Sequence, residues 1–336
     1  MSGWDGRSVL VTGARGFVGS WLAERLLDEG ARVVALRRDT DPGSRFAAEG
    51  IEQRCHVALA DLGDYQAMMR TLNEYEVDAV FHLAAQTIVG TANRSPLSTF
   101  HSNVHGTYTL LEACRATSVM GGAPAPIVVA SSDKAYGAHD ELPYREDFEL
   151  KPRYPYDVSK ACADLIARSY AATYGLPVAV TRFANVYGGG DVNWSRLVPD
   201  VARALVRGER PVVRSDGTPE RDYLYVEDAV DAYLAISASL EREEMRGRAW
   251  NAGNGRPVSV IELVRGLIEV SGRQEEPDVQ GQGVPHGEID RQFLDSTAIR
   301  DELGWAPRVE LEEGLRRAFE WYERYLGEGS DGGADG

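Results

Sequence analysis

The feature that most constrains the fold is a glycine-rich loop near the N-terminus. The run Gly13-Ala14-Arg15-Gly16-Phe17-Val18-Gly19 follows an apolar segment at Ser8–Val11 and precedes apolar residues at helical spacing. Glycines between a strand and a helix allow a tight turn, let a phosphate approach the backbone, and bring the helix close to the strand. Free N–H groups at the helix start favour an anion. The loop therefore predicts a βαβ unit that binds a dinucleotide.

The N-terminal half continues this alternation of short β-branched runs with longer helical patterns. Such an order is typical of parallel strands joined by helical crossovers. Further strands are expected at Arg32–Leu36, Cys55–Leu59, Ala79–Leu83, Ile127–Ala130 and Val178–Thr181. We predict an α/β protein with a Rossmann-like, doubly wound parallel sheet and a smaller C-terminal α/β substrate lobe.

The domain boundary is expected near Tyr187, where the elements become shorter. Residues 1–187 are assigned to an NAD(P)-binding Rossmann domain, with 223–240 as a segment that could return to it, and 188–327 to the lobe. Helices of the C-terminal part are expected at Arg196–Val206, Glu227–Leu240, Val258–Val270 and Leu311–Leu326. Residues 328–336, rich in Gly and Asp, bury too little apolar surface to order themselves, which predicts a flexible tail.

Charge and composition narrow the class of partner. A net charge of -16 disfavours nucleic acid and anionic membranes, which bind clustered Lys and Arg. No apolar run reaches the roughly 18 residues of a membrane helix, and the N-terminus lacks a secretory pattern. Cys55, Cys114 and Cys162 lack the spacing of a zinc or redox motif. We expect a cytoplasmic protein with reduced thiols and no metal site, which binds a small molecule.

Residues after the second expected strand bear on the choice between NAD and NADP. An acidic residue commonly binds the ribose hydroxyls of NAD at this place. Here the chain has Arg37 and Arg38, followed by Asp39. Two guanidinium groups can hold a 2′-phosphate, which favours NADP. If both arginines are only solvated, Asp39 would serve the ribose of NAD, so both cofactors stay open.

A tyrosine and a lysine four residues apart predict acid–base chemistry. Tyr156 and Lys160 share one face of an expected helix that begins near Tyr154. A free tyrosine has a pKa of about 10, and both the Lys160 cation and a positively charged nicotinamide favour the phenolate. A phenolate can take the proton of a hydroxyl group while hydride leaves for the cofactor.

Together these motifs resemble the extended short-chain dehydrogenase/reductase family, which contains NAD-dependent epimerases and dehydratases. The resemblance covers nearly the whole chain: the glycine loop, His82-Leu83-Ala84-Ala85-Gln86, Ser132, Tyr156 and Lys160, Asn185-Val186-Tyr187-Gly188, and Arg221-Asp222-Tyr223. It implies a tightly bound, recycled NAD(P), a nucleotide-sugar substrate, and a hydrogen bond from Ser132 to the reacting oxygen.

The resemblance also implies binding roles. Cofactor contacts are expected from Gly13, Arg15, Gly16, Phe17, Val18, Gly19, Arg37, Arg38, Asp61, Leu62, Ala84, Ala85, Asn103, Tyr156 and Lys160. Substrate contacts are expected from Gln86, Asn185, Arg196 and Arg221, with Asn185 and Arg221 at the diphosphate. Helices at Pro96–Thr117 and Tyr154–Tyr174 match those that pair across a two-fold axis in the family, which predicts a homodimer.

The residues after Ser132 indicate which reaction is catalysed. Epimerases need only the serine, tyrosine and lysine. A 4,6-dehydratase, once C4 is a ketone, also needs a base for the C5 proton and an acid for the departing C6 hydroxyl. The run Ser132-Asp133-Lys134 is similar to that of CDP-glucose 4,6-dehydratases, which implies Asp133 as general acid and Lys134 as general base. Lys134 must then be neutral; alternatively it only pairs with Asp133 or an acidic ligand group.

Other interpretations stay open. Arg221-Asp222-Tyr223-Leu224-Tyr225-Val226 looks like the common epimerase form, and Arg37-Arg38 resembles the NADP-using GDP-mannose dehydratases, so the nucleotide is undecided. A UDP-sugar 4-epimerase or a nucleotide-sugar decarboxylase would share everything except a need for Asp133 and Lys134. A non-catalytic NAD(P)-sensing regulator is a third alternative, which the presence of both Tyr156 and Lys160 disfavours.

Overall fold

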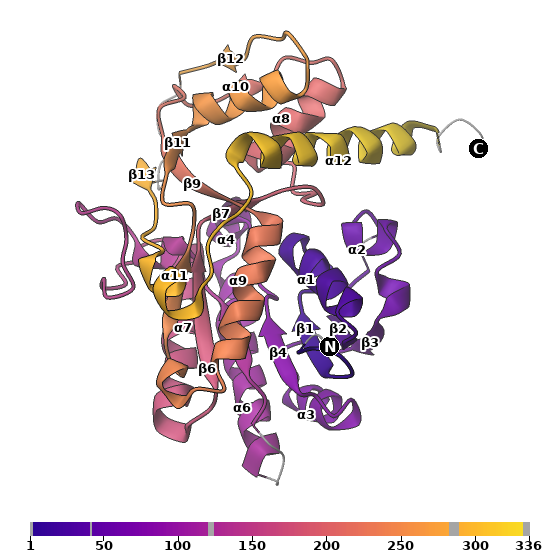
Figure 1. Cartoon of the computed structure of the whole chain (residues 1–336), viewed down its shortest axis with the longest axis vertical. Coiled ribbons are helices and arrows are strands. Elements are labelled where there is room, and N and C mark those ends of the chain that lie inside the picture. Colours follow the sequence, from indigo (N-terminus) through magenta and orange to yellow (C-terminus); the bar gives the residue numbers. More distant parts are fainter. Residues whose placement is uncertain (1–2, 41, 120–123, 282–288, 332–336) are drawn as a thin grey trace.

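The computed structural model describes residues 3–40, 42–119, 124–281 and 289–331. A seven-stranded parallel sheet forms its larger part (Figure 1). The strands are β1 (Ser8–Thr12), β2 (Arg32–Arg37), β3 (His56–Leu59), β4 (Ala79–His82), β5 (Ile127–Ala130), β6 (Val178–Phe183) and β10 (Ala249–Ala252). They follow the order β10-β6-β5-β4-β1-β2-β3, which reverses between β1 and β4. The predicted Rossmann-like, doubly wound sheet is confirmed.

Helices cover both faces of this sheet. One face carries α3 (Tyr65–Glu74), α6 (Gly106–Val119) and α7 (Pro155–Tyr174), and the other carries α1 (Phe17–Asp28) and α9 (Val226–Ser239). Successive side chains of a strand point to opposite faces. Accordingly Val9 and Val11 pack with α1 and α9, whereas Leu10 packs with α3 and α6. The strands are therefore buried on both sides, as expected for a parallel sheet.

Short elements fill the connections of the large sheet. They are α2 (Arg45–Ala48), η1 (Glu52–Arg54), α4 (Val89–Arg94), α5 (Pro96–Phe100), the π-helical turn η2 (His101–His105), the 3₁₀ turns η3 (Asp133–Tyr136) and η4 (Glu243–Met245), and α11 (Thr297–Leu303). Among the described residues, no helix combines the length and hydrophobicity needed to cross a bilayer.

A smaller group of elements, which we call the lobe, lies above the carboxyl edge of the large sheet (Figure 1). In it, β9 (Glu220–Tyr225) pairs with β7 (Asn185–Tyr187), β11 (Pro257–Ser259) and β13 (Arg291–Gln292). The other members are α8 (Leu197–Val206), β8 (Val212–Val213), α10 (Val260–Val270), β12 (Asp278–Val279) and α12 (Leu311–Asp331). The three helices share one hydrophobic cluster that contains Leu205, Leu263 and Tyr322.

Three observations differ from the expected division of the chain. Strand β10 pairs with β6 in the large sheet, although residues 249–252 were assigned to the lobe. The sequence Ala-Trp-Asn-Ala contains a polar residue and forms no apolar run, so it gives little strand signal. Of the segment 223–240, α9 packs on the large sheet, whereas β9 pairs within the lobe and sends only Leu224 into the core of the large sheet. Helix α12 continues to Asp331, into the predicted flexible tail, because each added residue gains a backbone hydrogen bond once the helix is anchored.

Candidate active site

The carboxyl ends of β1 and β4 bring the glycine loop and Ala84 together. Gly13 adopts φ of 77°, and a Cβ there would lie 2.7 Å from the backbone nitrogen of Ala84. A Cβ at Gly19 would overlap the carbonyl oxygen of Gly13. Both glycines are thus required by close approach of the backbone. Ala85 follows in the same loop, at the point where the strand order reverses and open α/β sheets bind ligands.

The start of α1 offers free donors. Its N-cap, Gly16, makes no side-chain capping bond, and the first turn contains no acidic residue. Unpaired N–H groups and the positive end of the helix dipole suit a pyrophosphate, so this loop fits NAD(P). Phe17 and Val18, expected at the cofactor, pack against the lobe's hydrophobic cluster.

Residues expected around the adenosine end lie at β2 and β3. Arg15 and Arg37 both donate from Nη1 to Oε1 of Glu52, over 3.0 and 2.9 Å. The sequence analysis missed Glu52, because it lies in η1 and outside any recognised motif. Arg38 makes an exposed ion pair with Asp39 at 2.6 Å.

The acidic residue expected at the adenine lies in the turn after β3. Asp61 accepts a hydrogen bond from the backbone N–H of Gly63 at 2.8 Å, and this bond fixes the turn. Asp61 itself is exposed, whereas Leu62 is half-buried. A Cβ at Gly106 would contact the Leu62 side chain, so Leu62 packs against the start of α6.

Tyr156 and Lys160, which we call the redox pair, lie on the first turns of α7, which begins at Pro155. Tyr156 and Lys160 are both buried, and Ser132 lies close enough to Tyr156 to lower its pKa. The Lys160 ammonium donates to the carbonyl oxygen of Ala130 over 2.8 Å, and Ser131 Oγ donates to the carbonyl of Lys160. These bonds dock α7 onto the end of β5. The structure thus brings Ser132, Tyr156 and Lys160 together, as predicted.

The electrostatics of this pair differ from the expectation. Burial raises the pKa of Tyr156 to about 12, while the nearby Arg196 charge lowers it. Burial lowers the pKa of Lys160 to about 8. The Lys160 ammonium is directed at a carbonyl oxygen, so in the protein alone it does not offset the desolvation of the phenol. The prediction that Lys160 and a positively charged nicotinamide together favour the phenolate concerns the cofactor-bound enzyme and stays a prediction.

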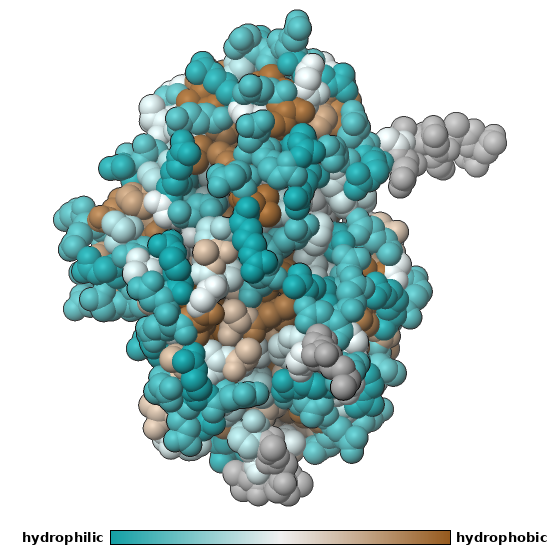
Figure 2. All heavy atoms as spheres, in the orientation of Figure 1, coloured by the Kyte–Doolittle hydropathy of each residue, from teal (hydrophilic) through white to brown (hydrophobic). Residues whose placement is uncertain are grey.

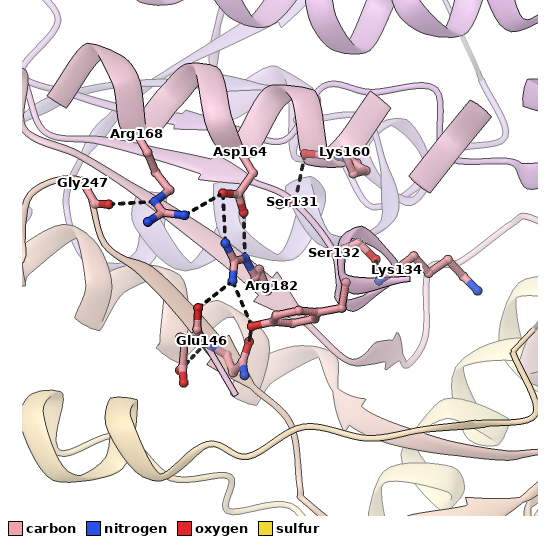
Figure 3. A network of polar contacts seen from close by, with 11 residues as sticks. Ser131, Ser132, Lys134, Glu146, Lys160, Asp164, Arg168, Arg182 and Gly247 are labelled. Atoms are coloured by element: carbon pink, nitrogen blue, oxygen red, sulfur yellow. Dashed lines mark hydrogen bonds and ion pairs between the residues drawn. The ribbon is translucent and has the colours of Figure 1, made fainter. Parts of the chain in front are cut away.

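Turn η3 places Asp133 and Lys134 directly after Ser132. Asp133 is 2% exposed; its Oδ1 accepts from Ser132 Oγ at 2.9 Å, and Oδ2 has no partner among the described residues. Burial raises the pKa of Asp133. Lys134 is half-buried, and its side chain extends away from η3 (Figure 3). Asp157, which the sequence analysis missed, lies near both: burial raises its pKa to about 6, Lys134 lowers it and Asp133 raises it.

The residues expected at the substrate come from three elements. Arg196, at the start of α8, donates from Nη1 to Asp191 at 2.9 Å and lies close enough to Tyr156 to lower its pKa. Arg221, on β9, is buried, donates to the carbonyl of Asp290 at 3.0 Å and lowers the pKa of Asp133. Asn185, on the neighbouring β7, is half-buried.

Gln292 is a further polar residue of this region, and no sequence motif indicated it. It faces Arg221 in the register of β13 with β9. The side chain is 0% exposed, yet neither its amide nitrogen nor its amide oxygen has a partner among the described residues. A buried unpaired amide is costly, so it marks a place where a bound molecule can supply the missing hydrogen bonds.

Asn103 differs from its expected role at the cofactor. It is buried in η2, where Oδ1 accepts from the backbone N–H of Gln86 at 2.7 Å. Its Nδ2 donates to the carbonyl of Gln86 at 3.0 Å and to Ser159 Oγ at 2.9 Å. Both N–H groups are thus used within the protein. Asn103 braces the loop of Gln86 against α7 and offers no donor to a cofactor.

Comparisons with known proteins agree with this geometry. A sequence model described as GDP-mannose 4,6 dehydratase matches residues 10–318. The CDP-glucose 4,6-dehydratase of Salmonella typhimurium is 30% identical over 338 residues, which cover 96% of this chain and 92% of that protein. DesIV, a dTDP-glucose 4,6-dehydratase from Streptomyces venezuelae solved with NAD and TYD bound, has 29% identity and a TM-score of 0.81, covering 96% of this chain and 98% of its own.

Epimerases and longer proteins are similar as well. The UDP-glucose 4-epimerase of Thermotoga maritima, solved with UDP-glucose, has 30% identity and a TM-score of 0.85, and the match covers 95% of this chain and 99% of that one. The chain spans about half the length, 47% and 48%, of two trifunctional UDP-glucose 4,6-dehydratase proteins of Arabidopsis thaliana. The match over residues 10–318, with relatives covered along nearly their whole length, shows that the chain belongs to the GDP-mannose 4,6-dehydratase family, a group of NAD-dependent dehydratases and epimerases.

Proposed function

We propose that the protein is a nucleotide-sugar 4,6-dehydratase, of the CDP-glucose or GDP-mannose type, which forms an NDP-4-keto-6-deoxyhexose. The observation that carries this proposal is the state of Asp133. Its carboxyl group is buried beside Ser132, has one oxygen without a partner among the described residues, and has a raised pKa. A carboxyl group that keeps its proton can act as an acid, which a 4-epimerase does not need.

The first step is oxidation at C4. Bound NAD(P) supplies the acceptor for the hydride from C4 and later the donor of hydride to C6. Tyr156 takes the proton of the C4 hydroxyl, and Ser132, which lies close enough to lower the pKa of Tyr156, orients the same oxygen. Lys160, buried at the base of the pair, holds positive charge near the phenolate as it forms.

Elimination of water follows because the C4 ketone makes the C5 proton acidic. Lys134, as a neutral amine, removes the C5 proton, and the C5–C6 double bond forms as the C6–O bond breaks. Asp133 protonates the departing hydroxyl, which leaves as water. Once hydride has been added at C6, Lys134 returns its proton to C5, which gives the 4-keto-6-deoxyhexose.

Substrate binding is assigned to groups from both halves of the molecule. Arg196 and Arg221 supply positive charge for the diphosphate, and Asn185 supplies an amide on the neighbouring strand. Gln86 lies in the loop that Asn103 fixes. Arginine suits this task because its planar fork matches two phosphate oxygens.

Cofactor preference is the finer question, and we propose NADP. Arg37 lies at the end of β2, where the 2′-phosphate of NADP is recognised in this fold. Glu52 competes for the same guanidinium group and for that of Arg15. The variant Glu52→Gln should therefore raise the ratio of NADP to NAD affinity roughly tenfold, since one charged contact is worth about 1.4 kcal/mol. An unchanged ratio would contradict a phosphate site at Arg37.

A homodimer is proposed through α5, α6 and α7. The face drawn in Figure 2 is mostly hydrophilic, with hydrophobic atoms in small patches. Large hydrophobic side chains are exposed on these three helices: Leu97 82%, Tyr108 42%, Leu165 55% and Tyr174 56%. Such a set on neighbouring helices is typical of an interface. Light scattering should give twice the mass of one chain, and Leu165→Glu should give one.

The decisive experiment is incubation with CDP-glucose, GDP-mannose, dTDP-glucose, UDP-glucose and UDP-N-acetylglucosamine in separate reactions, followed by mass spectrometry. Loss of one water from one of them is the expected result, and it names the nucleotide. Unchanged mass with an altered sugar configuration by NMR would instead support the 4-epimerase, which the likeness to the Thermotoga maritima enzyme favours. A sixth reaction, with a UDP-uronic acid, tests the decarboxylase by loss of carbon dioxide. Absence of any turnover with cofactor bound would support the sensing regulator.

A further inference from the structure

A fully buried polar network lies behind η3, on the side away from the Lys134 side chain (Figure 3). Arg182 on β6 forms its centre, with Asp164 on α7, Tyr136 at the end of η3 and Asn251 on β10 around it. Each of the four side chains is 0% exposed. None of them belongs to the catalytic or binding residues described above.

Each of the three side-chain nitrogens of the central arginine donates a hydrogen bond. Arg182 donates from Nε and Nη2 to the Asp164 carboxylate, at 2.8 and 3.1 Å. Its Nη1 donates to the hydroxyl of Tyr136 at 3.0 Å and to the carbonyl of Glu146 at 3.1 Å. The guanidinium carbon also lies 4.8 Å from the centre of the Tyr136 ring.

Tyr136 connects the network to β10. The hydroxyl of Tyr136 donates to Asn251 Oδ1 at 2.7 Å. Asn251 Nδ2 in turn donates to the carbonyl of Tyr144 at 2.9 Å. Fully satisfied buried networks are rigid, since moving any member leaves a polar group unpaired at low dielectric.

The network connects α7, which carries the redox pair, with η3, which carries the proposed acid and base. Asp164 lies one turn after Lys160 on α7. Tyr136 is the last residue of η3, the turn that begins with Asp133 and Lys134. At a rise of about 2.0 Å per residue, the three residues of η3 before Tyr136 span only about 6 Å. A displacement of Tyr136 is therefore passed to Asp133 almost undiminished.

We infer that Arg182, Tyr136 and Asn251 are positioning residues that fix the distance between the redox pair on α7 and the acid–base pair on η3. This inference rests on the proposed dehydratase, in which one sugar ring must present C4 to Tyr156 while C5 and C6 meet Lys134 and Asp133. Misplacement of a reacting group by about 1 Å can slow a step by about 10²-fold. An epimerase uses the redox pair alone, so it would not need a fixed distance between α7 and η3.

The test is Tyr136→Phe, which removes one hydroxyl and leaves the ring and the Arg182–Asp164 ion pair in place. Holoenzyme is mixed with the nucleotide hexose that the wild-type enzyme dehydrates. Near-ultraviolet absorbance of the reduced cofactor follows hydride transfer from C4, and quenched samples give loss of water by mass. Hydride transfer should stay within about threefold of wild type while water loss slows by about 10- to 100-fold, so that reduced cofactor accumulates.

Matched variants separate positioning from general stability. Asn251→Ala cuts the same connection from β10 and should show the same split between the two steps. Tyr187→Phe is the control, because Tyr187 is 3% exposed and its hydroxyl donates at 3.4 Å to the carbonyl of Leu311 in the lobe, far along the chain from η3. It should leave both steps unchanged.

Three outcomes are decisive. Equal slowing of hydride transfer and water loss in Tyr136→Phe, or no slowing of either, would overturn the positioning role. The same selective loss in Tyr187→Phe would also overturn it, since any buried hydroxyl would then suffice. If the wild-type enzyme releases no water from any nucleotide sugar, the proposed function itself fails, and this is seen before a variant is made.

Discussion

Two groups of buried charges lie on neighbouring turns of α7 and differ in how they are paired. Asp164 is 0% exposed and accepts two hydrogen bonds from Arg182. Lys160, one turn earlier, is 5% exposed, and its one hydrogen bond among the described residues goes to the carbonyl of Ala130. Both side chains are buried, yet among the described residues only Asp164 has a partner of opposite charge. The difference fits a positioning network around Asp164 and the catalytic role that we propose for Lys160.

The largest effect is expected at Tyr156, which forms the redox pair with Lys160. Tyr156→Phe should lower kcat by roughly 10³-fold, because general acid–base catalysis by a positioned group contributes about 10²- to 10⁴-fold. The temperature of unfolding should not fall, since the phenol is desolvated and its pKa is already raised by burial. Steady-state kinetics and thermal unfolding measure the two quantities. Tyr170→Phe, on the same helix, is the control, and a kcat within tenfold of wild type for Tyr156→Phe would refute the assignment.

At the ion pair of Arg182 and Asp164, in contrast, a substitution should lower the stability of the protein. Arg182→Met leaves the Asp164 carboxylate buried without its main partner, which should lower the free energy of unfolding by about 3–5 kcal/mol. Arg168→Met removes a second partner of Asp164, at 3.7 Å and with a side chain that is 43% exposed, and should cost under about 1 kcal/mol. Urea unfolding of the two variants measures the contrast. Equal losses would show that burial does not decide the strength of these pairs.

How far the sequence predicts each region follows from the range of its contacts. The glycine loop and the spacing of Tyr156 and Lys160 are local patterns, so the Rossmann-like sheet and the redox pair could be predicted. Arg182 and Asn251 give no such signal. The Tyr136–Asn251 bond joins residues 115 positions apart, and it depends on a strand, β10, whose four residues form no apolar run.

The same reasoning explains the errors at single residues. Asn103 stands where a cofactor contact was expected, but its amide is used by Gln86 and Ser159, which only the folded chain brings together. Glu52 lies 37 residues from Arg15 and 15 from Arg37, so its place between them follows from the packing of η1. Burial, which raises the pKa of Tyr156 in the protein alone, is also a property of the whole fold.

Removing the unpaired charge should stabilise the protein. Burial lowers the pKa of Lys160 from 10.5 to about 8, so the folded state binds fewer protons than the unfolded state between these values. The cost of the charge is therefore fully present below pH 8 and disappears as the pH rises towards 10.5. Lys160→Met should raise the free energy of unfolding by roughly 1–3 kcal/mol at pH 7, with turnover abolished. Denaturation at neutral and alkaline pH checks this, and destabilisation at pH 7 would place Lys160 with the paired group.

The smallest effect is expected at Asp157, a buried carboxyl group that belongs neither to the Arg182 network nor to the redox pair. It is 7% exposed, and burial raises its pKa from 3.8 to about 6. The folded state thus binds more protons than the unfolded state in that interval, so Asp157 lowers stability increasingly as the pH rises from about 4 to about 6. Asp157→Asn should gain roughly 1–2 kcal/mol at pH 7 and nothing below pH 4.

The same variant also distinguishes the two roles open to Lys134. Asp157 and Lys134 lie close enough to interact, so Asp157→Asn removes a negative charge beside the Lys134 side chain. If Lys134 is the base for the C5 proton, the acidic limb of the pH profile for water loss should move to lower pH, while the profile for hydride transfer stays in place. If Lys134 only pairs with a ligand group, loss of the Asp157 charge should tighten substrate binding, because the ammonium then has one competitor fewer, and the limb should not move. A stable enzyme with both profiles unchanged would show that the Asp157 charge acts on neither step of the reaction.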